Sequence, residues 1–324
     1  MIPTGGTGGR VKFAIHTPAT LRAAALALRD ALVARGFRPK LHGAVLTPPW
    51  HVSGLMPAIR ARETGGVFAV SDGRFAPEAP LPAIDLPGDG TRLASLVPIQ
   101  LSRLLALPDG ESWLRQFDLI LLGGGSIPTP LLADIRSRKL PVALTYGMTE
   151  TAAAAALAWV ADIPEGEPSS GEPLPGTVFA SPGGRITVRS PSLCAGYWPA
   201  SPISAPFDTG DLGAVEHGRV RVTGRADRLV VTGGEKVDPA RVESVLTAPG
   251  LAKAALVFAL PDASWGGLLV ASVVGPAALE PALRAAAERG LEPAARPRRY
   301  LFVEELPYDT RGKVDTERLG RLLG

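Results

Sequence analysis

Residues 4–12 read T-G-G-T-G-G-R-V-K, so consecutive glycines, two threonine hydroxyls and a lysine share one short segment. Backbone N–H groups of such a turn can approach phosphate oxygens closely, and a nearby cation neutralises their charge. Lys12 follows a valine and precedes a phenylalanine, which departs from the pattern G-x-x-x-x-G-K-[ST], and a plain glycine turn stays an alternative. The phosphate contacts predicted from this segment are Thr4, Gly5, Gly6, Thr7 and Lys12.

Residues 145–151 read T-Y-G-M-T-E-T and follow a strand-like apolar stretch. Tyr146 offers a stacking face, the Thr149 hydroxyl can donate to a phosphoryl oxygen, and Glu150 is a hard oxygen ligand for Mg²⁺. Nucleotide sites in α/β proteins use such groups at the carboxyl ends of strands. The alternative is a helix start, in which Thr149 caps the helix and Glu150 only favours its dipole.

Residues 208–211 (D-T-G-D) and 224–227 (G-R-A-D) lie on either side of a short predicted strand. Asp211 and Arg225 could hold a ribose diol between a carboxylate and a guanidinium. Two acidic turns in a β region are the alternative interpretation.

Lys313 lies in the tail segment P-Y-D-T-R-G-K-V-D, residues 307–315. Only six of the 34 basic residues are lysines, yet Lys12, Lys236 and Lys313 all lie in or beside glycine-containing loops. Because a lysine ammonium is a compact point charge, its use there favours contact with a reacting carboxylate or phosphate. For Lys313, an ordinary solvated basic turn is the alternative.

The elements that must position these residues follow an α/β pattern. Short strand-like stretches alternate with helical spacing, which predicts βαβ crossovers and a mostly parallel sheet. From residue 183 the pattern changes to short alternating strands, which predicts a small β element closing the larger domain. The strand-like stretches are 43–46, 67–70, 119–122, 141–144, 184–189 and 219–222, and the helical ones are 20–35, 53–64, 93–105 and 130–138.

The chain has 324 residues, 46% of them hydrophobic, which predicts two domains because single cores stop growing near ~250–300 residues. We place the core domain at 1–226 and a compact α+β lid at 227–324. The lid should contain a helix from Pro239, strands at 254–260 and 268–274, and a helix at 280–289.

The formal charge of +3 comes from scattered arginines, which argues against a dedicated nucleic-acid surface. The single cysteine, Cys194, excludes an internal disulfide framework and a multi-cysteine metal site. No apolar run reaches the ~20 residues that span a bilayer, and the start has no signal-peptide pattern. We therefore expect a cytoplasmic protein without membrane insertion, and a homodimer is an open alternative.

Taken in this order, the segments resemble the acyl- and aryl-CoA synthetase branch of the adenylate-forming superfamily. The glycine-rich segment resembles its phosphate loop, and residues 146–150 match its Y-G-x-T-E motif in full. The resemblance implies a nucleotide site with Tyr146 and Gly147, and catalytic roles for Thr149, Glu150 and Lys313. It further implies an adenine-side loop at Gly123, Gly124, Gly125 and Ser126, a ribose pair at Asp211 and Arg225, and a hinge at Asp227.

Within that family, residues 50–55 (W-H-V-S-G-L), 96–101 (L-V-P-I-Q-L) and 231–237 (V-T-G-G-E-K-V) most resemble o-succinylbenzoate:CoA ligases. That resemblance implies an acid pocket and a loop for the CoA half-reaction. The pocket residues would be His51, Ser53 and Arg60, with Arg60 facing the dianionic acid, and the loop residues Gly233, Gly234 and Lys236. A core histidine is the alternative for His51.

The resemblance implies a large α/β domain with a small β element and a mobile α+β lid. It implies a two-step reaction with ATP, Mg²⁺ and CoA, and o-succinylbenzoate as the acid, in menaquinone or phylloquinone biosynthesis. Residues 8–12 lack one hydroxyl and the proline that usually end the phosphate loop, and the chain begins at that loop, so we expect a short form of the fold. Two rival functions stay open, another small aryl- or acyl-CoA ligase and a non-catalytic adenine-nucleotide-binding module.

Overall fold

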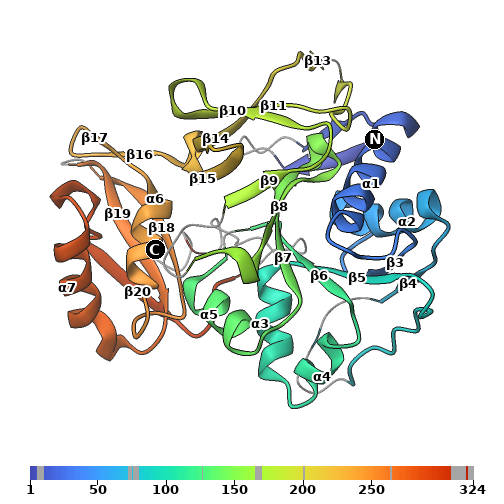
Figure 1. The fold of residues 1–324 in the computed structure, drawn as a ribbon. Helices are drawn as coiled ribbons and strands as arrows, with labels where there is room; N and C mark the ends of the chain where they lie inside the picture. Colours follow the sequence, from blue (N-terminus) through green and yellow to red (C-terminus); the bar gives the residue numbers. More distant parts are fainter. Residues whose placement is uncertain are drawn as a thin grey trace. The chain divides into compact units, whose positions relative to one another are not determined.

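The computed structural model describes residues 1–5, 11–71, 75, 80–125, 127–164, 170–199, 201–262, 265–307 and 319 (Figure 1). The chain forms two compact units. The first comprises Met1–Ser126, Ile135–Thr209 and Ala214–Val222, and the second Ile127–Asp134, Gly210–Gly213 and Thr223–Gly324. The division at residue 226 stays a prediction.

Five neighbouring strands form the parallel block of the large sheet, in the order β7-β6-β5-β3-β4. Helices connect β3 to β4, β5 to β6 and β6 to β7, so the predicted βαβ pattern and the α/β fold class are confirmed. The strands are β3 (Leu41–Val45), β4 (Phe68–Val70), β5 (Thr91–Leu96), β6 (Leu119–Leu122) and β7 (Val142–Met148), and the helices are α2 (Val52–Thr64), α3 (Pro98–Ala106), α4 (Gly110–Leu114) and α5 (Thr129–Ser137).

The helix predicted for residues 93–105 is wrong in its first part. Leu93, Ala94 and Leu96 are buried within strand β5, which pairs with β3 and β6 on either side. The helix begins only at Pro98, since a proline fits the first helical turn, where its missing N–H is not needed. An apolar stretch buried on both faces carries no period that separates strand from helix.

Helix α1 (Pro18–Val33) packs against the first unit's core near the start of the chain. Thr17 and Thr20 form a reciprocal capping box that fixes where the helix begins. Its buried residues Ala24 and Ala25 pack with Met56 of α2 and with Ala152. The two helices thereby support the turn that follows strand β7.

Antiparallel strands continue the large sheet beyond β7, in the order β7-β8-β9-β15-β14-β11-β10. A separate four-stranded sheet has the order β1-β2-β12-β13. These strands are β8 (Ala153–Trp159), β9 (Ser170–Pro173), β10 (Val178–Ala180), β11 (Arg185–Arg189), β14 (Phe207–Glu216) and β15 (Arg219–Arg225), then β1 (Ile2–Gly5), β2 (Val11–Ala14), β12 (Gly196–Trp198) and β13 (Ser201–Pro202).

The second unit has its own core, in which Val242, Leu246, Leu269 and Leu283 are fully buried. The predicted lid elements are confirmed, including the helix that begins at Pro239. Its elements are β16 (Val230–Thr232), β17 (Glu235–Val237), α6 (Pro239–Leu246), β18 (Ala254–Asp262), β19 (Gly266–Val274), α7 (Glu280–Gly290) and β20 (Arg299–Val303).

Short 3-10 turns complete the described fold: η1 (Thr149–Thr151), η2 (Val160–Asp162), η3 (Pro182–Gly184), η4 (Ala226–Arg228), η5 (Ala277–Leu279) and η6 (Pro293–Ala295). Among the described helices, none combines the length and the apolar character needed to cross a bilayer.

Candidate active site

Turn η1 begins directly after strand β7 and carries Thr149 and Glu150. The register between β7 and β8 shifts at Tyr146 and Gly147, so the chain bulges just before the turn. A Cβ atom on Gly147 would lie 1.7 Å from the carbonyl oxygen of Ala153, which only glycine avoids. The position of Thr149 and Glu150 therefore depends on the close approach of two backbone segments.

The chain leaves η1 through two non-glycine residues in the left-handed region, Ala152 at φ 54° and Ala153 at φ 79°. Such a conformation costs of order 1–3 kcal/mol per residue and persists only where the surroundings hold it. Ala152 is completely buried against α1 and α2. Packing thus holds a strained backbone beside the predicted catalytic residues.

Glu150 is 8% exposed and accepts two hydrogen bonds on the same oxygen. The hydroxyl of Tyr197 donates to its Oε1 atom at 2.7 Å, and Thr4 Oγ1 donates at 3.4 Å. The structure therefore brings together Thr4 of the predicted phosphate loop and Glu150 of the Y-G-x-T-E motif. Tyr197 was missed in the sequence, because no local pattern links a tyrosine in strand β12 to a glutamate 47 residues earlier.

Lys12 belongs to the same cluster through the small sheet. Strands β1 and β2 pair so that Thr4 faces Lys12, and β2 also pairs with β12, with Tyr197 opposite Ala14. The Nζ atom of Lys12 lies 5.4 Å from the ring centroid of Tyr197, within the range of a cation–π contact. Gly6, Thr7 and the rest of the loop between β1 and β2 lie outside the described residues.

Burial raises the pKa of the Tyr197 phenol, and the hydrogen bond to Glu150 raises it further. The phenol therefore keeps its proton and acts as a hydrogen-bond donor across the physiological pH range.

His16 contacts the same turn from the end of strand β2. Its Nε2 atom lies 2.7 Å from the carbonyl oxygen of Thr149, and its Nδ1 atom lies 3.0 Å from Thr20 Oγ1. A carbonyl oxygen only accepts, so Nε2 carries the proton in this contact. Burial lowers the pKa of His16, which favours the neutral ring at pH 7. His16 was also missed in the sequence, where a single histidine before a helix gives no signal.

Gly123 follows strand β6 at the same sheet edge as the end of β7. A Cβ atom on Gly123 would lie 2.0 Å from Thr145 Oγ1, so the predicted adenine-side loop directly adjoins the strand that leads to Tyr146. The Tyr146 ring packs at 5.7 Å from that of Phe179, which supports one face of the tyrosine. Gly124 has φ 83°, Gly125 follows it, and Ser126 lies outside the described residues.

Two of the predicted acid-pocket residues lie at the start of α2. His51 is the N-cap residue of this helix and is partly exposed, and Ser53 lies in its first turn. The neighbouring Trp50 is 63% exposed, and its ring centroid lies 6.2 Å from that of His51.

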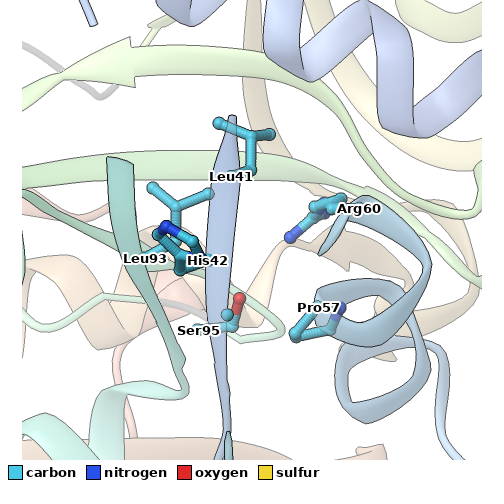
Figure 2. Close-up of a pocket in the computed structure, with 7 residues that line it drawn as sticks. Leu41, His42, Pro57, Arg60, Leu93 and Ser95 are labelled. Carbon is cyan, nitrogen blue, oxygen red and sulfur yellow. The ribbon is translucent and has the colours of Figure 1, made fainter. Parts of the chain in front are cut away.

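Arg60 lies further along α2, seven residues after Ser53 and therefore about 10 Å along the helix axis. It is only 5% exposed, and Figure 2 shows its side chain directed from α2 toward strand β3. Its Nε atom is buried and has no hydrogen-bond partner within the described part of the chain. The structure thus does not place Arg60 beside His51 and Ser53.

The recess that Arg60 lines has no space for a water molecule. Burial lowers the pKa of the Arg60 guanidinium to about 10. Contact between this guanidinium and an acid would require the recess to open. The residues around it are Leu41, His42, Gly43, Pro57, Leu93 and Ser95.

In the second unit, Arg225 binds two carboxylates at once. Its Nη1 atom donates to Asp211 at 3.0 Å, and its Nε and Nη2 atoms donate to the two oxygens of Asp227 at 2.8 Å each. These bonds raise the pKa of Arg225, with Asp227 as the largest cause. The predicted ribose pair and the predicted hinge residue are therefore one connected group.

The Gly233-Gly234 turn joins strands β16 and β17. Gly233 has φ 58°, and its N–H donates to the carbonyl oxygen of Trp265 at 2.9 Å. The guanidinium of Arg298 lies 3.6 Å above the Trp265 ring. Lys236 lies in β17 and is exposed, whereas Lys313 lies outside the described residues.

The residues around Glu150 fit a magnesium ion. The described residues contain no group of three or more histidine, cysteine or acidic side chains that could hold a metal by themselves. Mg²⁺, however, usually keeps several waters and binds through one or two carboxylates together with substrate phosphates. Glu150 meets this requirement, because both of its hydrogen bonds from described residues fall on Oε1 and leave Oε2 for a ligand.

Comparison with known proteins gives consistent matches. Residues 1–198 match the family model of the AMP-binding enzyme, and residues 241–313 match that of the AMP-binding enzyme C-terminal domain. A probable 2-succinylbenzoate--CoA ligase of Mycobacterium tuberculosis is 36% identical over 99% of this chain and 83% of its own length.

Solved structures agree with these matches. The o-succinylbenzoate CoA synthetase of Bacillus subtilis, in complex with its acyl-adenylate intermediate, aligns with a TM-score of 0.78 and 25% identity over 98% of this chain and 68% of its own. The same enzyme in complex with ATP and a magnesium ion aligns with a TM-score of 0.75 and 24% identity over 98% and 69% of the two chains.

Proposed function

This chain belongs to the AMP-binding enzyme family, and we propose that it is an AMP-forming acid:CoA ligase that joins o-succinylbenzoate to CoA through an acyl-adenylate. The main support is the 2-succinylbenzoate--CoA ligase relative, which matches 99% of the chain. The cluster of Thr4, Lys12, Glu150 and Tyr197 supports it independently, because it joins a cation, a hydroxyl and a carboxylate beside one loop.

In the first step, a carboxylate oxygen of the acid attacks the α-phosphorus of ATP. A P–O bond forms to the acid, the bond to the β-phosphate breaks, and pyrophosphate leaves with the electron pair. Negative charge is shared by the phosphate oxygens throughout, so preorganised cations and donors lower the barrier. Lys12, the Thr149 hydroxyl and Lys313 are the groups that we assign to this charge.

Magnesium, when bound, neutralises phosphate charge and orients the leaving pyrophosphate. Glu150 would hold it through Oε2. Its carboxylate is buried and tied at Oε1 by Tyr197 and Thr4, so its orientation is set before the nucleotide arrives.

Asp211 would accept hydrogen bonds from the ribose hydroxyls of ATP. Arg225 holds this carboxylate in place and compensates its burial, since Asp211 is only 6% exposed. Tyr146 and the glycines at 123–125 would contact the adenine, since they lie at the ends of neighbouring parallel strands.

In the second step, the CoA thiolate attacks the carbonyl carbon of the acyl-adenylate, and AMP leaves. We assign Gly233, Gly234 and Lys236 to this step and Asp227 to the hinge between the two half-reactions.

K313A should abolish adenylation and spare thioester formation from supplied acyl-adenylate. Equal loss of both half-reactions would contradict the assignment of Lys313.

His51, Ser53 and Arg60 remain our proposed contacts for the acid, and the dianion o-succinylbenzoate is its proposed identity. Menaquinone or phylloquinone biosynthesis, a cytoplasmic location and a homodimeric state are part of the same proposal.

The proposal is tested by pyrophosphate release from ATP and Mg²⁺ with o-succinylbenzoate, benzoate or no acid, each with and without CoA. We expect release with o-succinylbenzoate and a CoA thioester when CoA is present. Release with benzoate but not with o-succinylbenzoate would support the ligase reaction and identify a different acid as the substrate. Measurable ATP binding without release from either acid would overturn the enzymatic proposal.

A further inference from the structure

Tyr197 contacts two charged groups of the proposed ATP site through two different parts of its side chain. Its hydroxyl donates to Glu150 Oε1 at 2.7 Å, and its ring lies 5.4 Å from the ammonium of Lys12. Both charged residues belong to segments far from it in the chain. A single side chain therefore touches both the carboxylate and the cation proposed for the nucleotide.

Lys12 and Glu150 carry opposite charges near one site and would neutralise each other if they paired. In the described part of the chain, Lys12 faces the Tyr197 ring, and the Tyr197 hydroxyl donates to Glu150, with no ion pair between the two charges. The Tyr197 ring offers its negative face to the ammonium, and the Tyr197 hydroxyl satisfies one carboxylate oxygen. Each charge is thus held by the tyrosine without being cancelled by the other.

We infer that Tyr197 is a positioning residue that keeps Glu150 Oε2 available for the magnesium ion and Lys12 available for the phosphates of the same ATP. This inference rests on the proposed function for the identity of the nucleotide. The inference goes beyond that function by assigning a role to a residue in strand β12, outside the segments 4–12, 123–126 and 145–151.

Removal of the hydroxyl alone separates the two contacts. Y197F keeps the ring beneath Lys12 and removes the donor to Glu150, whereas Y197L removes both. Without this donor, only the 3.4 Å hydrogen bond from Thr4 orients the buried carboxylate, so metal binding must restrict it further. A hydrogen bond to a charged group corresponds to about a tenfold change in an equilibrium constant. Trp198, the exposed neighbour in the same strand, provides the matched control W198F.

Binding of ATP is measured by isothermal titration calorimetry without any acid, over a series of Mg²⁺ concentrations and in EDTA. For Y197F, we expect the Mg²⁺ concentration at half-maximal binding to rise about tenfold, while affinity in EDTA stays that of W198F. For Y197L, affinity in EDTA should fall as well, because Lys12 loses its support. An unchanged Mg²⁺ requirement in Y197F would overturn the inference.

A double-mutant cycle with E150Q distinguishes positioning from a general loss of folding. If Tyr197 acts through Glu150, Y197F should change the Mg²⁺ requirement of E150Q by less than about twofold. Full additivity of the two substitutions in the Mg²⁺ requirement would show that Tyr197 does not act through Glu150. Thermal unfolding of each variant reports whether it is folded.

The experiment contains no acid and no turnover, so its outcome is separate from that of the pyrophosphate assay. A wild type that binds Mg²⁺ and ATP but releases no pyrophosphate would contradict the proposed function and leave the role of Tyr197 intact. A wild type whose ATP binding is insensitive to Mg²⁺ would contradict the role of Tyr197 directly.

Discussion

The Nε2 atom of His16 lies 2.7 Å from the backbone carbonyl oxygen of Thr149, a residue 133 positions further along the chain. The contact joins the end of strand β2 to the turn that carries Thr149 and Glu150. Because the donated proton binds a main-chain oxygen, it constrains the turn itself and not one rotamer of a side chain. His16 therefore holds the backbone from which two proposed catalytic side chains project.

H16L and H16Q separate this hydrogen bond from the packing of the ring. The glutamine amide can place a donor near the position of Nε2, whereas leucine cannot. We expect H16L to lower kcat for pyrophosphate release about tenfold with a smaller change in KM, and H16Q to retain most of the rate. Steady-state kinetics of both variants with o-succinylbenzoate measures the changes in kcat and KM separately. Equal losses in the two variants would show that the hydrogen bond has no role.

The stability of the protein should depend on pH through His16. Burial lowers its pKa in the folded state, so between that value and the ordinary value near 6.5 the unfolded chain binds more protons. The stabilisation by the neutral ring is fully present above about pH 6.5 and is lost as the pH falls through the folded pKa. Urea unfolding at pH 7.5 and at pH 5.5 should therefore show a larger loss for the wild type than for H16Q. A loss of the same size in both would exclude His16 as the cause.

Gly147 should not tolerate a side chain. Its Cβ atom would lie 1.7 Å from a carbonyl oxygen, so G147A must push strands β7 and β8 apart. We expect a decrease of about 2–4 kcal/mol in the free energy of unfolding and loss of pyrophosphate release. A Cβ atom on Gly88 would meet no atom of the other described residues within 4 Å, so the control G88A should lie within about 0.5 kcal/mol of the wild type. Urea denaturation measures both variants.

Arg225 should be irreplaceable by lysine. Its guanidinium binds Asp211 and both oxygens of Asp227 simultaneously, whereas an ammonium on a flexible stem cannot reproduce this fork. We expect R225K to raise KM for ATP about tenfold, because the Asp211 carboxylate loses its fixed partner. Arg185, which pairs with Asp208 in an exposed position, provides the control R185K, with KM for ATP unchanged. Retention of the wild-type KM in R225K would argue against Asp211 as the ribose ligand.

Substitution of Arg60 tests whether the acid substrate is a dianion. A buried guanidinium with an unpaired Nε atom is costly to the fold, and a dianionic ligand is the partner that would offset this cost. R60M should therefore leave stability unchanged or raise it by about 1 kcal/mol, while KM for o-succinylbenzoate rises and KM for benzoate does not. A stability gain without any change in KM would remove Arg60 from the acid pocket.

Local sequence determined the elements and the order of the motifs. The helix at Pro239, the strands of the second unit and the βαβ pattern follow from hydrophobic periodicity and from proline and glycine signals, which act over a few residues. The Y-G-x-T-E segment is predicted from its residue types and its family motif, since its glycine, hydroxyl and carboxylate lie within five consecutive residues.

Only the tertiary structure decided which residues support that turn and what surrounds Arg60. Leu93 and Leu96 lie in a strand because the neighbouring strands β3 and β6 flank β5 and bury it. The local spacing of apolar residues does not reveal such burial. His16 and Tyr197 reach Thr149 and Glu150 across 133 and 47 positions. Tyr197 lies in β12 and His16 lies just after β2, and these two strands pair only in the fold. Hydrogen bonds between distant segments have no sequence pattern, because their geometry is set by the packing of whole elements.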